Sequence, residues 1–136
     1  MDTRKLLVAT AAVFVVYSGL AFVIHEVILG PDYEPMVGSV ARSVEAFTQR
    51  VPLLYLGNLV FALAFCLIYA KGYEPTKGWL GQGLRFGLIL GTLLAPIALT
   101  EYVVYPVAGL LALKWILFGY VQVILSALVA AGLYRP

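Results

Sequence analysis

The chain has 136 residues, of which 62% are hydrophobic and only 12% are charged, and its net charge is +2. Soluble domains carry about twice that share of charge, and a core of this size could not bury so much apolar surface. The weak, scattered positive charge sets aside a nucleic-acid-binding protein. The single cysteine, Cys66, excludes a disulfide within the chain. The composition therefore indicates an integral membrane protein whose partner is the lipid bilayer.

Four segments are long and apolar enough to cross a bilayer, which takes about 20 residues. They are residues 5–29, 52–70, 80–104 and 107–134. The first is too long for the core of a cleaved signal peptide and ends at the helix stop Gly30-Pro31. Pro52 and Pro106 suit the starts of the second and fourth segments. The predicted fold is an all-α bundle of four transmembrane helices in one domain, residues 1–136.

The basic residues are divided unequally between the two sides of such a bundle. The side that holds both termini receives Arg4, Lys5, Lys71, Lys77, Arg85 and Arg135. The opposite side receives Arg42, Arg50 and Lys114. Because loops rich in Lys and Arg stay in the cytoplasm, we expect both termini to be cytoplasmic.

The loop after the first span, residues 31–50, is long for a small bundle. Its apolar residues recur at helical spacing, with polar residues between them: Met36, Val37, Val40, Val44 and Phe47. This pattern predicts a short amphipathic helix over residues 36–49 on the outer side. Such a helix would lie on the membrane surface or cover the outer ends of the bundle.

Small residues recur every four positions along the third span. They are Gly83, Gly87, Gly91 and Ala95. This spacing places them on one helix face, where another backbone can approach closely. The partner is either another span of the same chain or a separate protein, such as a second copy or a subunit of a larger membrane complex.

Most polar side chains within the predicted spans lie in the outer half. The candidates for binding a ligand or an ion are His25, Glu26, Tyr55, Asn58, Glu101 and Lys114. Charged groups near hydrocarbon are costly, so they are candidates for a functional site by default. Their shared depth predicts a cavity open to the outer side. Lys114 would then be the counter-ion of Glu26 or Glu101.

A metal site is a weaker hypothesis. His25, Glu26 and Glu101, together with Asp32, offer nitrogen and oxygen ligands that suit zinc or a similar ion. However, the chain has one histidine and lacks the paired spacing typical of metal-binding helices. It also lacks a nucleotide-binding loop and a catalytic serine motif. We therefore expect no cofactor and favour a protein that is not an enzyme.

Two stretches and one residue pair resemble small bacterial four-span membrane proteins that have no assigned function. The stretches are LIYAKGYE, residues 67–74, and GWLGQGLRFG, residues 78–87. The pair is His25-Glu26, which precedes a Gly-Pro turn. This resemblance implies a location in the bacterial inner membrane and implies no activity.

Three functions are compatible with the sequence. The leading hypothesis is a non-enzymatic accessory or interaction subunit that packs through its glycine face. The alternative is a binder or transporter of a small solute or ion that uses the outer polar residues. A metal-dependent membrane enzyme is a second alternative.

Overall fold

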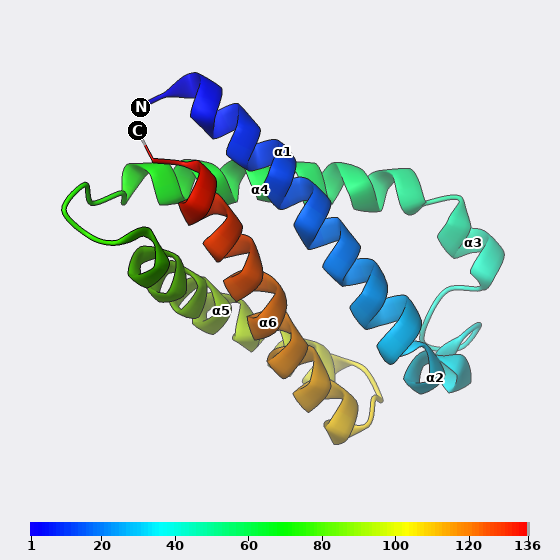
Figure 1. Ribbon diagram of the computed structural model, residues 1–136. Coiled ribbons are helices and arrows are strands. Elements are labelled where there is room, and N and C mark those ends of the chain that lie inside the picture. The colour runs from blue at the N-terminus through cyan, green and yellow to red at the C-terminus, as the bar shows by residue number, and fades with distance from the viewer. Residues whose placement is uncertain (136) are drawn as a thin grey trace.

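The computed structural model describes residues 1–135, which form helices joined by short loops (Figure 1). Within these residues, four helical segments are long and apolar enough to cross a membrane. The first is α1 (Thr3–Phe22), which continues as a π-helix, η1 (Val23–Ile28). The others are α4 (Val51–Lys71), α5 (Trp79–Val104) and α6 (Gly109–Leu133). The predicted all-α fold with four segments of membrane-spanning length is confirmed.

Several helix ends are set by local sequence signals. Asp2 caps α1, because its carboxylate accepts a hydrogen bond from the Lys5 backbone N–H (3.0 Å). Pro52 lies in the first turn of α4, where its missing N–H leaves no bond unmade. Gly72 ends the same helix. The fourth helix begins at Gly109, slightly later than the sequence indicates.

The four long helices pack in the order α4, α1, α6, α5. The most extensive contact is between α5 and α6, and α1 packs against both α4 and α6. Helices α4 and α5 meet near their connecting loop, where the Phe86 ring lies 4.7 Å from Phe65 and 5.4 Å from Tyr69 between centroids. Away from that loop α4 diverges from α5 (Figure 1). Helices α1 and α6 are therefore the two inner elements, and α6 is the one in contact with both α1 and α5.

Both termini lie at the same end of the bundle as the α4–α5 loop (Figure 1). We call this the terminal end. The Asp2 backbone N–H donates to the Tyr134 hydroxyl (3.3 Å), and the Lys5 ammonium donates to the Arg135 carbonyl. The Arg135 guanidinium lies 5.2 Å from the centre of the Trp79 ring, a cation–π contact. The opposite end, which holds the loop between η1 and α4 and the α5–α6 loop, is the far end.

The predicted amphipathic helix over residues 36–49 is wrong in extent. The loop contains a one-turn helix α2 (Gly30–Tyr33), a 3-10 turn η2 (Glu34–Met36) and a short helix α3 (Val44–Thr48). Gly38 adopts a left-handed conformation (φ 77°), which interrupts any helix there. Ser43 then caps α3, because its hydroxyl accepts from the Ala46 N–H (3.3 Å). Turn and cap residues therefore override the apolar spacing.

Helices α5 and α6 approach most closely at the glycines of α5. A Cβ atom at Gly87 would lie 2.7 Å from the Ile124 Cα, and one at Gly83 would lie 3.0 Å from the Ala131 Cβ. At Gly87 this distance leaves no room for a side chain, and at Gly83 a side chain would fit only if its neighbours moved. The part of the predicted face that holds Gly83 and Gly87 is thus covered by α6 of the same chain.

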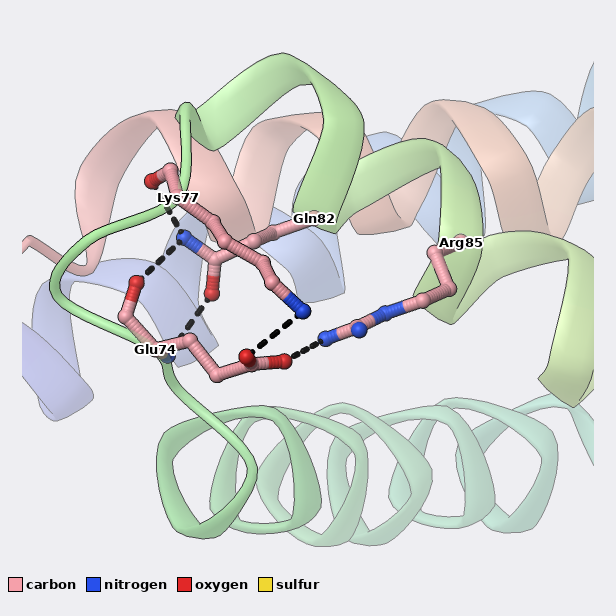
Figure 2. Close-up of polar contacts among 4 residues, drawn as sticks. All are labelled: Glu74, Lys77, Gln82 and Arg85. Carbon is pink, nitrogen blue, oxygen red and sulfur yellow. Dashed lines mark hydrogen bonds and ion pairs between the residues drawn. The ribbon is translucent and has the colours of Figure 1, made fainter.

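A buried glutamine fixes the loop between α4 and α5 (Figure 2). The Gln82 amide oxygen accepts from the Glu74 backbone N–H (2.8 Å). Its amide nitrogen donates to the carbonyls of Glu74 (3.0 Å) and Lys77 (2.8 Å). The Gln82 side chain therefore forms hydrogen bonds with three backbone groups of the loop.

The Glu74 carboxylate forms ion pairs beside this buried amide, below it in the view of Figure 2. It contacts the Lys77 ammonium (2.7 Å) and the Arg85 guanidinium. These contacts hold the pKa of Glu74 below its ordinary value, mainly through the hydrogen bond from Lys77. Because the group is exposed, solvent screens the pairs and they contribute little to stability.

Gly87→Ala should destabilise the protein by about 1–3 kcal/mol, because the added Cβ would meet the backbone of α6. The matched control is Gly57→Ala, since a Cβ at Gly57 meets nothing within 4 Å. The control should be neutral or slightly stabilising. The free energy of unfolding in mixed detergent micelles measures both. Equal effects of the two substitutions would show that the α5–α6 contact is looser than described.

Gln82→Met should cost about 1–3 kcal/mol, because it removes three partly buried hydrogen bonds to the backbone of Glu74 and Lys77. The control is Glu74→Gln, which removes the exposed ion pairs and keeps the backbone bonds. It should have a smaller effect. The rate of proteolytic cleavage within residues 72–78 is compared with the free energy of global unfolding. This comparison distinguishes local opening of the loop from unfolding of the whole protein. A larger effect for the control would contradict the role assigned to Gln82.

Candidate functional site

A cavity of about 380 Å³ lies between α1, α5 and α6 in the half of the molecule near the far end. Tyr17 and Gln122 line its inner part, and His25 and Glu101 line its outer part. Along α5 its lining runs from Gly91 to Glu101, which corresponds to roughly 15 Å of helix. The cavity lies toward the end of the bundle that the sequence predicts to face the outer side, and that orientation stays a prediction.

Small residues leave this space open. Ala95 and Ala98 line it from α5, and Gly119 lines it from α6. A Cβ added at Gly119 would meet no atom within 4 Å. The Tyr120 ring packs against Gly91, with its Cδ1 2.5 Å from the position a Cβ would take there. The small-residue tract of α5 thus has two roles, since Gly83 and Gly87 pack against α6 while Ala95 lines the cavity.

A hydrogen-bonded chain of three aromatic residues lies at the outer part of the cavity. The Trp115 indole N–H donates to the Tyr33 hydroxyl oxygen (2.7 Å). The same hydroxyl lies 2.7 Å from His25 Nδ1, and the Tyr33 and His25 rings are nearly parallel (14°). His25 belongs to the π-helix η1, a type of segment that is frequent at functional sites.

This chain favours one position for the proton on the His25 ring. The indole N–H can only donate, so it takes up acceptor capacity on the Tyr33 oxygen. Burial, the largest influence, raises the pKa of Tyr33 above its ordinary value, so its hydroxyl keeps its proton. That proton can point at His25 Nδ1. The arrangement favours neutral His25 with its proton on Nε2.

Glu101 occupies a special position between two spaces. It lines the cavity and also a shallower hollow of about 550 Å³ at the far end. Arg42 and Tyr105 line this outer hollow as well, and Trp115 is shared by both spaces. Among residues 1–135, no ion pair involves Glu101. Its carboxylate is therefore available to a ligand that approaches from either space.

The predicted counter-ion of the acidic residues is used elsewhere. The Lys114 ammonium lies 2.7 Å from the Asp32 carboxylate, and each side chain is about one-third exposed. The expected pairing of Lys114 with Glu26 or Glu101 is therefore wrong. The physical reason is that the short helix α2 brings Asp32 back over α6. This ion pair ties α2 to α6 beside the cavity.

The other predicted site residues are dispersed. The Asn58 amide donates to the Ser18 hydroxyl (3.1 Å), which joins α4 to α1. Tyr55 packs edge-on against Phe14, with ring centroids 6.4 Å apart. Glu26 is exposed and does not line the cavity. Of the six candidates, His25 and Glu101 line the cavity together.

The metal hypothesis gains no support from this geometry. Within the described part of the chain, no three His, Cys, Asp or Glu side chains gather closely enough to hold an ion. His25, Glu26 and Glu101 thus do not form a ligand set. Two residues of the site, Tyr33 and Trp115, escaped the sequence reasoning, because aromatic residues near a membrane surface are commonplace anchors.

No protein-family model, curated protein or solved structure matches the chain. The chemistry of the site therefore has to be inferred from its own residues. An apolar space with a few convergent polar groups is the usual form of a small-molecule site.

Tyr33→Phe should remove both hydrogen bonds of the aromatic chain and release His25 from a single tautomer. His25 is the only histidine, so its ring nitrogens give isolated NMR signals. In the wild type, the nitrogen shifts should report a protonated Nε2 and an accepting Nδ1. The variant should show a mixture. Tyr105→Phe, which changes a hydroxyl in the outer hollow, should leave the pattern unchanged, and a shift there of the same size would contradict the assigned chain.

Proposed function

We propose that this protein binds a small solute in the cavity between α1, α5 and α6. The main support is that an open cavity and an available acidic group occur together. Glu101 lines the cavity and has no counter-ion among residues 1–135. A volume of about 380 Å³ falls within the usual range of small-molecule sites. Binding energy would come mainly from burial of apolar surface.

The distribution of polar groups gives such a solute an orientation. The ring of Trp115 and the small residues Ala95, Ala98 and Gly119 offer apolar surface. Glu101 offers a charged acceptor at the outer part. An amphipathic solute would therefore place its apolar body against the small residues of α5 and α6 and its polar group at Glu101.

The proposed setting is a bacterial inner membrane, with both termini in the cytoplasm. Four helices of membrane-spanning length support a multi-pass protein. Six of the nine Lys and Arg residues lie near the terminal end, which supports a cytoplasmic location for it. In this orientation the cavity faces the outer side of the membrane.

The hypothesis of an interaction subunit stays a prediction. Its main feature was the glycine face, which α6 covers within the same chain. A second copy or another membrane subunit would have to pack on a different surface. Solute binding is therefore the function that the geometry favours.

Gly119→Leu should weaken solute binding, because the side chain would extend into the cavity without a backbone clash. Gly57→Leu is the matched control, since a Cβ there also meets nothing and Gly57 does not line the cavity. The fluorescence of Trp115, in a Trp79→Phe background, measures binding in lipid nanodiscs. The probes are quinoline, tetraphenylphosphonium and tetraphenylborate.

The expected result is saturable quenching by at least one probe in the parent and in Gly57→Leu. Gly119→Leu should weaken that binding by at least about tenfold, or about 1.4 kcal/mol. Empty nanodiscs of the same lipid correct for partition into the bilayer. If no probe gives quenching that depends on Gly119, the proposed function is wrong.

A further inference from the structure

The charges around the outer part of the cavity do not cancel. Lys114 is paired with Asp32 (2.7 Å), so this cation and this anion neutralise each other. The hydroxyl of Tyr33, oriented by Trp115, favours neutral His25. Glu101 lines the cavity without an ion-pair partner among residues 1–135, so the site offers an acidic group that no protein cation balances.

Two further charged groups lie nearby and do not change this balance inside the cavity. Glu26 is exposed, and as a second anion it adds to the negative potential. Arg42 lines the outer hollow together with Glu101 but does not line the cavity. Among residues 1–135, Arg42 forms no ion pair within 4 Å. Within the cavity, therefore, no Lys or Arg side chain of the described residues lies beside Glu101.

The cavity offers aromatic rings close to this carboxylate. Tyr33 and Trp115 line it beside Glu101, and Tyr17 and Tyr120 line it further in. The face of an aromatic ring attracts a cation, by about 0.5–2 kcal/mol depending on solvent exposure. A carboxylate near hydrocarbon is itself costly, and a bound cation offsets that cost. Both the aromatic rings and the acidic side chain therefore favour a ligand with a positive charge.

We propose that the solute is a small organic cation, with an apolar body in the cavity and a positive group held at Glu101 beside the rings of Tyr33 and Trp115. This inference rests on the proposed function and specifies its ligand class. An anion of the same shape would meet the Glu101 carboxylate and would find Lys114 already engaged by Asp32. A neutral solute would gain only the apolar contacts.

The test compares two ions of nearly the same shape and opposite charge, tetraphenylphosphonium and tetraphenylborate. Binding is measured by Trp115 fluorescence of the full chain in nanodiscs of zwitterionic lipid, so that anionic headgroups do not concentrate the cation. Glu101→Gln removes the charge and keeps the size of the side chain. Glu26→Gln is the matched control, because Glu26 is exposed, as Glu101 is, but does not line the cavity.

The parent protein should bind the phosphonium at least about tenfold more tightly than the borate. Glu101→Gln should weaken phosphonium binding by about tenfold and remove the preference. Glu26→Gln should retain it. Glu101→Asp, which keeps the charge on a shorter side chain, should retain the preference and serves as the second variant if Glu101→Gln does not fold.

Three results would overturn the inference. They are equal binding of the two ions, an unchanged preference in Glu101→Gln, and an equal loss in Glu26→Gln, which would indicate a general surface potential. In each case, quenching by any probe that depends on Gly119 would leave the proposed solute site intact. Loss of all Gly119-dependent quenching would instead reject the proposed function itself.

Discussion

The separation of α5 and α6 controls the shape of the whole bundle. Near the terminal end the two backbones touch, because Gly83 and Gly87 carry no side chains. At Gly91 the ring of Tyr120 lies between the helices, and beyond it the small residues Ala95 and Gly119 do not fill the space. Along the same pair of helices, a tight contact near the terminal end is thus followed by a cavity toward the far end. Because α6 also packs on α1, this pair positions the third wall of the cavity.

The far-end polar groups act on this space as a set. The ion pair of Asp32 and Lys114 ties α2 to α6, and Tyr33 on the same short helix binds both His25 and Trp115. Two potential cations of the site are thereby engaged, one by an ion pair and one by hydrogen bonding. Glu101, on α5, is left without a counter-ion in the described chain. Helix α2 thus determines the electrostatics of a cavity to which it contributes only Tyr33.

Hydropathy and helix signals predicted the four long helices closely, because a bilayer requires continuous apolar segments of a minimum length. The four-residue spacing of small residues predicted a close-packed face on α5. The same spacing allows any helix to approach, so the sequence alone could not identify α6 as the partner. The helix expected over residues 36–49 failed because Gly38 and Ser43 outweigh apolar spacing. The partner of Lys114 was missed because it depends on how α2 folds back after η1, and a π-helix has no clear sequence signature.

The π-helix η1 has a consequence for the length of the first membrane segment. The Leu29 N–H bonds to the Ile24 carbonyl, five residues back, so this stretch holds one more residue than an α-helical turn would. A residue added to a regular α-helix would rotate the rest of the chain about the helix axis by roughly 100°. The wide turn of η1 takes up the extra residue instead, so the chain enters α2 in nearly the direction that an uninterrupted α-helix would give it. His25 lies within this wide turn, which adjusts the length of the first helix without turning Asp32 and Tyr33 away from α6.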